Sequence, residues 1–386
     1  MRLCKLKTRV NTYGLVEKYK SLAKKKHEKI IVHIKSEAVE CYSQYPFGGE
    51  LANYVNRKLE YLQNTINNIK YSRDCIRPNV YTYISEEINA FAAKISDTTY
   101  VIAISTAIFS NLNQELSSYL CHSDIRAHFY GKHLNIKKHV ERILNYILLF
   151  IVLHENYHIL NGHLDTYFPS ENLMFESGAK FESKNQILQI LELDADYCAV
   201  RSLVYLLDEK YHFEDWADRE FLLAGFSLYY IFLIFQEKNY ENIQSIGDYL
   251  NDFTHPPASV RIVHASSLLL RYGTNLFSNK EKLLSVVYEL VDLCIYFDRI
   301  YYDSDTVEMT LIAYGYTPKG TEYLQSLYDK WKYVRKKLET YAQIELREVE
   351  SLNSNQNYFL NNQGEFVKVL NMEKRMELFW KNLLRL

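Results

Sequence analysis

Several markers of common protein classes are missing from this chain. Its six cysteines are scattered along 386 residues without a Cys-x-x-Cys pair, which argues against a disulfide framework and a thiolate zinc site and favours a reducing compartment. The net charge of −2 supplies no basic field, so we expect no nucleic-acid partner. Residues 1–5 lack the apolar core of a signal peptide. Cytoplasm is therefore the expected location.

Apolar runs long enough to cross a membrane are also missing. Residues 146–153 and 221–235 resemble spans, but each falls short of the roughly 20 residues that a spanning helix needs. We interpret both as buried core helices and expect no membrane span. Hydrophobic residues make up 48% and charged residues 24% of the chain, which is ordinary for a globular protein.

The pattern of apolar residues predicts an α+β protein that is predominantly helical. Residues 1–74 favour helices, with helical apolar spacing in 16–39 and 50–71. Residues 80–84 and 100–104 are rich in β-branched and aromatic side chains, which predicts strands. The result is a small β-sheet rather than an alternating βαβ series.

After Thr106 the chain is predicted to be mainly helical, with helices over 187–207 and 325–349. The polar segment 113–138 is interpreted as a surface loop or insertion, and 357–367 as a hairpin. We expect an N-terminal helical region at 1–74, a core at 75–270 and a C-terminal helical region at 271–386.

The segment with the clearest chemistry is His154-Glu155-Asn156-Tyr157-His158, which follows the apolar run 146–153 directly. On a helix the two histidines lie four residues apart on one face, so both imidazoles can reach one metal ion. Glu155 lies between them and can hold or deprotonate a water at that ion. Three fixed residues also recur by chance, so the motif needs further ligands to support it.

A catalytic zinc usually takes three protein ligands, so one must come from elsewhere. His163 is nearest in sequence, but on a continuous helix it would point away from the His154 and His158 face, and we do not expect it to be a ligand. Glu192 and Asp196 lie four apart on a predicted helix. Glu192 can complete the site, and Asp196 can accept a hydrogen bond from a ligand histidine. The alternative for this acidic pair is a solvated helix edge.

A third segment of interest is Thr254-His255-Pro256-Pro257, followed by Arg261 at the expected start of a helix. A histidine and an arginine held near a metal can stabilise an oxyanion. Taken alone, the segment reads as a helix N-terminus with incidental polar residues.

Together these segments resemble the CAAX prenyl protease/HtpX family of metallopeptidases. The resemblance rests on the order of the motif at 154–158, the acidic pair at 192–196 and the turn at 254–257. Residues 89–92 and the strand after them are similar to the family's segment ahead of the metal helix. The resemblance covers about residues 76–270, and it departs from the family within 154–158, where Asn156 and Tyr157 replace small residues.

The resemblance implies a zincin (gluzincin-like) core that binds one Zn2+ ion. It implies three zinc ligands, which are His154, His158 and Glu192. Glu155 is implied as the general base and Asp196 as the residue that orients a ligand histidine.

The same resemblance implies how a protein or peptide substrate is held. His255 and Arg261 are implied to lie near the tetrahedral intermediate. Asn89, Ala90 and Phe91 are implied to form an edge strand that pairs with an extended peptide.

The expected function is therefore a zinc-dependent intracellular endopeptidase, in which metal-activated water hydrolyses peptide bonds of a protein substrate. The first alternative is a regulatory protease of the ImmA/IrrE type that acts on a repressor. The second is a zincin-like binding protein without turnover, against which Glu155 argues because a pure binder needs no base. The third is a helical interaction protein with an accidental motif.

Overall fold

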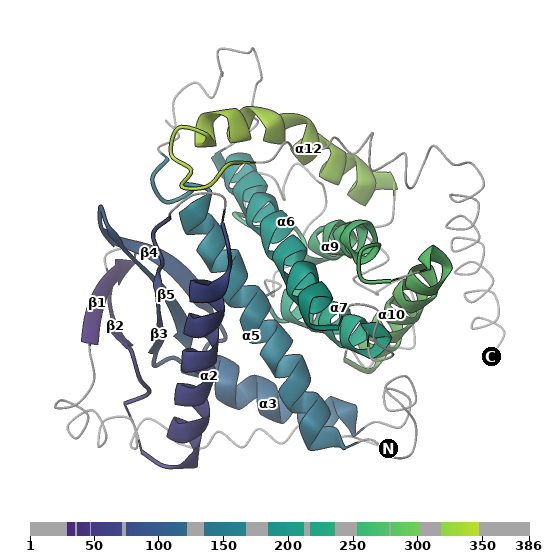
Figure 1. The fold of residues 1–386 in the computed structure, drawn as a ribbon, viewed down its shortest axis with the longest axis horizontal. Helices are drawn as coiled ribbons and strands as arrows, with labels where there is room; N and C mark the ends of the chain where they lie inside the picture. Colours follow the sequence, from purple (N-terminus) through teal and green to yellow (C-terminus); the bar gives the residue numbers. More distant parts are fainter. Residues whose placement is uncertain are drawn as a thin grey trace. The chain divides into compact units, whose positions relative to one another are not determined.

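The computed structural model describes ten segments, which are residues 29–34, 37–46, 48–71, 75–121, 135–166, 184–211, 217–235, 253–277, 279–301 and 318–346. They belong to two compact units, one drawn from residues 1–69 and 77–109 and the other from 70–76 and 110–386. The first unit holds a five-stranded mixed sheet, and helices dominate the second (Figure 1). The chain is thus α+β and mostly helical, with the sheet N-terminal to the helical region.

The sheet combines parallel and antiparallel pairing. Its strands are β1 Lys29–Ile34, β2 Glu37–Tyr42, β3 Asn79–Tyr83, β4 Ala90–Ser96 and β5 Thr99–Ser105. They lie in the order β1-β2-β3-β5-β4, with β3 and β5 parallel and the other neighbours antiparallel. The strands predicted at 80–84 and 100–104 are therefore confirmed as β3 and β5.

The helical prediction for the N-terminal region is wrong at β1 and β2. These strands form an antiparallel pair in which Val32 lies opposite Val39. Ile31 and His33 are exposed while Val32 between them is buried, which is the two-residue period of a strand. Helical spacing was a misreading of this β-branched run, because strand pairing overrides a weak local preference. Residues 1–28 lie outside the described residues.

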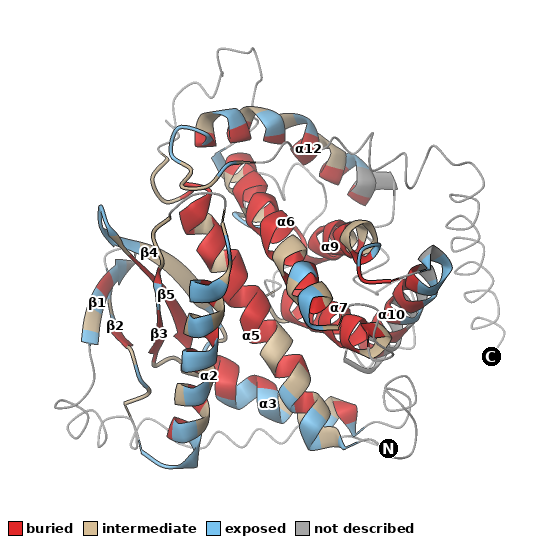
Figure 2. Cartoon of the chain, in the orientation of Figure 1, coloured by how far each residue is buried: buried red, intermediate tan, exposed pale blue. Residues whose placement is uncertain are grey.

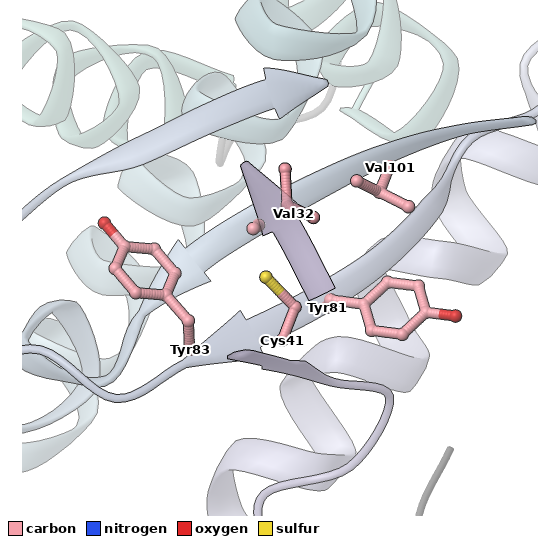
Figure 3. Close-up of a cluster of buried hydrophobic side chains, with 6 residues drawn as sticks. Val32, Cys41, Tyr81, Tyr83 and Val101 are labelled. Atoms are coloured by element: carbon pink, nitrogen blue, oxygen red, sulfur yellow. The ribbon is translucent and has the colours of Figure 1, made fainter. Parts of the chain in front are cut away.

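A cluster of buried side chains joins four strands of the sheet. Val32, Cys41, Tyr81, Tyr83 and Val101 belong to it and are labelled in Figure 3. The same unit contains helix α2, Glu50–Asn68, which confirms the helix predicted over 50–71. Its buried residues recur every three or four positions, as expected of an amphipathic helix; they are Ala52, Val55, Leu59, Leu62 and Ile66.

The helical region after β5 begins with α3, Thr106–Leu120. The later helices are α5 Ile136–Leu160, α6 Lys184–Tyr211, α7 Ala217–Ile234, α9 Ala258–Gly273, α10 Lys280–Tyr301 and α12 Pro318–Leu338. α5 packs against α6 and α7, and α6 also packs against α9 and α12. α5, α6 and α7 are buried over most of their length (Figure 2), so these three helices form the core of this unit.

Both apolar runs noted in the sequence lie in buried helices, α5 and α7, as predicted. Among the described helices, α5 alone is long and apolar enough to cross a membrane by length and composition. However, 78% of its apolar window is buried inside the structure. That degree of burial is typical of a core helix.

Two predicted elements have different bounds in the structure. The loop expected over 113–138 is wrong for 113–120, which continue α3, and for 136–138, which begin α5. In α3, Leu112, Leu116 and Leu120 bury one helical face. Residues 122–134 lie outside the described residues, and α5 then begins after Asn135, whose side chain accepts a hydrogen bond from the Lys138 amide.

The helix expected over 325–349 is α12, which begins earlier and ends at Leu338. The amides of Tyr341 and Ala342 both donate to the Leu338 carbonyl, each at 2.8 Å, and close a turn there. The hairpin expected at 357–367 lies outside the described residues.

Candidate metal centre

The two neighbouring core helices bring together the side chains predicted as metal ligands. His154 and His158 lie one turn apart on α5, and Glu192 lies on α6. One ligand atom of each residue lies within 4.8 Å of the other two, so the group can hold a metal ion. Over the described segments, no second group of three His, Cys, Asp or Glu side chains meets this condition.

The two imidazole nitrogens and the Glu192 carboxylate group form a compact triangle of ligands. The Nε2 atoms of His154 and His158 lie 3.0 Å apart. Glu192 places Oε2 3.2 Å from the first of these nitrogens and Oε1 3.4 Å from the second. The side chains are 9%, 13% and 15% exposed, respectively, so the triangle is largely shielded but can be reached from solvent.

Asp196 supports the first histidine from behind. Its Oδ1 lies 2.8 Å from Nδ1 of His154, the ring nitrogen that faces away from Glu192. Arg261, in the first turn of α9, donates two hydrogen bonds of 2.8 Å to the same carboxylate. Asp196 is fully buried, so this bidentate arginine compensates a charge that would otherwise be costly to bury.

Arg261 is enclosed between Asp196 and an aromatic ring. Its guanidinium lies 4.5 Å from the centroid of Phe232 on α7, and its Nη2 lies 4.0 Å from Oε2 of Glu192. The guanidinium thus lies behind the triangle and is directed mainly at Asp196. This placement makes Arg261 first of all a partner of the orienting carboxylate.

His255 lies on the open side of the triangle. Its Nε2 is 3.6 Å from Oε2 of Glu192, and its side chain is 53% exposed. Thr254 Oγ1 lies 3.0 Å from the other ring nitrogen, Nδ1. The Pro256–Pro257 turn that follows leads into α9, so a rigid segment holds this exposed imidazole beside the group.

The residues inside the motif have different surroundings. Glu155 is half-buried, whereas Asn156 and Tyr157 are buried. Asn156 donates to the Tyr71 hydroxyl at 2.8 Å, and the Tyr157 hydroxyl lies 2.6 Å from Ser202 Oγ. The unusual pair within the motif therefore contributes hydrogen bonds to the surrounding core.

His163 lies in a different position from the one predicted, because α5 ends before it. The helix ends at Leu160, and Gly162 has φ of +77°, a left-handed conformation that favours glycine. The premise of a continuous helix through His163 is therefore wrong. The chain turns back so that His163 Nδ1 lies 2.9 Å from Nδ1 of His158. His163 is not part of the ligand triangle but contacts one of its members.

Burial and neighbouring charges together set the ionisation of the triangle. Burial lowers the pKa of His154, but Asp196 and Glu192 outweigh it and raise that pKa to about 10. Burial depresses the pKa of His158 well below its usual value. Burial raises the pKa of Glu192, yet His255 and the two motif histidines hold it well below its usual range. A bound cation would thus replace a proton on His154.

The residues implied in substrate binding lie in the sheet unit. Ala90 and Phe91 begin β4, the last strand in the sheet order, and Asn89 precedes them. The Asn89 carbonyl accepts a 2.9 Å hydrogen bond from the Ser105 amide, and Phe91 packs against Tyr83 with ring centroids 5.3 Å apart. Their role towards a substrate stays a prediction.

Sequence reasoning missed Asp194, which lies midway between Glu192 and Asp196 on α6. Its carboxylate is fully buried and accepts hydrogen bonds from residues of two distant segments. The acidic stretch at 192–196 was a usable signal, because a third carboxylate there needs a partner when buried. The partners on α12, Trp331 and Arg335, could not be predicted, because they lie more than 130 residues away in the sequence.

No protein-family model matches this chain, and no curated protein or solved structure matches it either. The resemblance to CAAX prenyl protease/HtpX metallopeptidases therefore rests on the motifs alone and stays a prediction.

Proposed function

We propose that the protein is a zinc-dependent endopeptidase whose ligands are His154, His158 and Glu192. The observation that carries the proposal is the close approach of these three side chains: the two imidazole Nε2 atoms lie 3.0 Å apart, and the two Glu192 oxygens lie 3.2 and 3.4 Å from them, one oxygen to each nitrogen. Ligand atoms at tetrahedral zinc, with bonds of about 2.0–2.1 Å, lie about 3.3 Å from one another. Two imidazoles and one carboxylate are also a ligand set of catalytic zinc. We propose with it a gluzincin-like zincin core.

The side chains around the proposed ligands can each take a role in peptide hydrolysis. Zinc at this site would supply a Lewis acid that polarises the scissile carbonyl and acidifies a water. Glu155 accepts the water proton and passes it to the leaving amine. Asp196 fixes the ring of His154, and Arg261 holds Asp196 ionised in its buried position.

His255 is the residue best placed to contact the reacting carbonyl. It is exposed and lies 3.6 Å from Glu192, so its imidazole borders the space that a substrate would enter. A hydrogen bond from Nε2 to the developing oxyanion would stabilise the transition state. Because Arg261 is enclosed, we expect it to stabilise the oxyanion through its charge and not through direct contact with the substrate.

A protein or peptide substrate in the cytoplasm completes the proposal. An extended peptide would add to the edge of β4, near Asn89, Ala90 and Phe91, through main-chain hydrogen bonds. Retention of Glu155 beside the ligands favours catalysis over the alternative of a zincin-like binding protein, because metal binding alone does not require this carboxylate.

Glu155→Gln tests the proposed chemistry. The variant keeps the size of the side chain but removes the base, so zinc content should remain near one per chain while peptide cleavage falls about 10²–10⁴-fold. The assay measures zinc content and cleavage of a peptide library. Glu141→Gln, at an exposed position earlier on α5, is the matched control and should cleave like wild type. Equal cleavage by wild type and Glu155→Gln would exclude this role.

A further inference from the structure

We propose that His163 and Asp194 form a relay that positions the ligand His158 and that α12 anchors it. The relay deepens the proposed function and rests on it for its purpose. It starts at the 2.9 Å contact between the Nδ1 atoms of His158 and His163. His163 Nε2 then lies 3.1 Å from Oδ2 of Asp194. Three side chains from α5, the turn after it and α6 are thus connected in series.

The direction of the hydrogen bonds follows from the metal site. Nε2 of His158 faces His154 and Glu192, so a metal needs the lone pair of this nitrogen. The proton of a neutral His158 ring then lies on Nδ1 and is donated to His163. His163 accepts at Nδ1 and donates from Nε2 to Asp194. In this arrangement both ring nitrogens of His163 have a hydrogen-bond partner.

The far end of the relay lies on α12. Trp331 donates its indole N–H to Oδ1 of Asp194 at 2.6 Å, and Arg335 donates to the same oxygen at 2.5 Å. Asn161 donates to Oδ2 at 2.6 Å. Trp331 and Arg335 are four residues apart, so one face of the helix supplies both contacts. Burial of Asp194 is complete, so these donors fix its carboxylate in orientation.

Each ligand histidine thus has its own carboxylate and arginine. His154 is held directly by Asp196, which Arg261 binds. His158 is instead reached through His163, with Asp194 and Arg335 behind it. Such outer partners orient a ligand ring and raise its basicity, and their loss typically weakens metal binding about 10–100-fold.

The turn at the end of α5 makes the relay possible. The left-handed Gly162 returns the chain so that the His163 amide donates to the His158 carbonyl at 3.0 Å. The segment after α12 packs on this turn, since the Gln343 amide donates to the Leu160 carbonyl at 2.8 Å. The C-terminal helical region is therefore an integral part of the metal centre.

The test replaces His163 with Phe, which keeps a ring but removes both nitrogens. Zinc affinity, measured by competition with a chelator, should fall about 10–100-fold. His163→Gln retains one acceptor and one donor on its amide and should recover most of the affinity. His33→Phe, an exposed histidine on β1, is the control and should bind zinc like wild type. Wild-type affinity in His163→Phe would overturn the relay.

A second readout separates the relay from the protease proposal. In zinc-free protein with ¹⁵N-labelled histidine, the His158 Nδ1 proton should show a hydrogen-bonded NMR signal that disappears in His163→Phe. Trp331→Phe tests the relay from α12 with His163 intact and should weaken zinc binding by about tenfold or less. If the wild-type protein binds no zinc, the protease proposal is contradicted, but the relay is still tested by the NMR signal. An unchanged signal in His163→Phe contradicts the relay alone.

Discussion

Asp196 contacts two residues through its carboxylate, and its single charge therefore has two consequences. It orients His154 and it compensates Arg261, at distances of 2.8 Å in both cases. Since all three groups are at least nine-tenths buried, water cannot replace either contact. A change at this one carboxylate should therefore affect both metal affinity and stability.

Asp196→Asn is expected to show both effects. The amide keeps the shape but not the charge, so zinc affinity should fall about 10–100-fold. The buried arginine loses its counter-charge, which should lower the free energy of unfolding by about 3–5 kcal/mol. Chelator competition and urea denaturation measure the two quantities. Asp208→Asn, half-buried later on α6, is the control; affinity equal to that control would contradict the orienting role.

At the residue scale, spacing predicted which side chains meet but not how the second histidine is supported. The four-residue intervals in 154–158 and 192–196 place pairs on one helix face, and the structure brings His154, His158 and Glu192 together. His163 was misplaced because a helix was extended through Gly162. A left-handed glycine reverses the chain direction, and a single sequence does not reveal whether a glycine adopts that conformation.

At the scale of elements, the turn between α5 and the following segment is tightly constrained. A Cβ atom added at Gly162 would lie 2.7 Å from the backbone carbon of Tyr341, and the residue has φ of +77°. Steric crowding and backbone strain therefore act together at this position. By contrast, a Cβ at Gly48 would meet no heavy atom within 4 Å.

Gly162→Ala should consequently destabilise the protein by more than about 1 kcal/mol, because the native backbone conformation is unfavourable for alanine. Urea denaturation of the metal-free protein measures the change. Gly48→Ala provides the matched glycine-to-alanine control and should differ little from wild type. Equal midpoints for the two variants would show that the turn tolerates a side chain.

The buried carboxylates of α6 should make the free energy of unfolding of the metal-free protein depend on pH in the acidic range. Burial raises the pKa of Asp194 and of Asp196, but Arg335 and Arg261 respectively outweigh it and hold both values below the usual range. A depressed folded-state pKa gives stability that is present above the unfolded value of about 3.9 and lost as pH falls below it.

Each of these carboxylates should contribute up to about 1.4 kcal/mol per pH unit below pH 4. The measurement is the free energy of unfolding in urea from pH 5 to pH 3. Asp194→Asn removes one titrating group and should give a shallower fall than wild type. A parallel fall in both proteins would contradict the ionised, arginine-paired state of Asp194.

The elements themselves were predicted unevenly. Helical apolar spacing identified α2 and α6, and continuous apolar runs identified α5 and α7, which are buried over most of their length. β1 was taken for helix because six residues rich in isoleucine and valine carry little periodicity, and only pairing with β2 fixes their state. The predicted bounds of α12 lay too far towards the C-terminus, because the helix ends at a turn formed after Leu338.

At the scale of the whole molecule, the candidate centre draws on segments that are far apart in sequence. The ligands come from α5 and α6, and their supporting side chains come from α9 and α12. Burial at the core of the helical unit explains why so many charged groups there are paired. The sheet unit contributes none of the three ligands, and its proposed role is confined to the substrate.

The zinc content of the purified full chain, after expression with ample zinc, tests the central claim most directly. Wild type and Glu209→Gln, an exposed position at the end of α6, should each contain one zinc per chain by elemental analysis. Glu192→Gln should contain far less after the same dialysis, because a neutral amide is a poor zinc ligand. Wild type without stoichiometric zinc, or Glu192→Gln with as much zinc as wild type, would contradict the account.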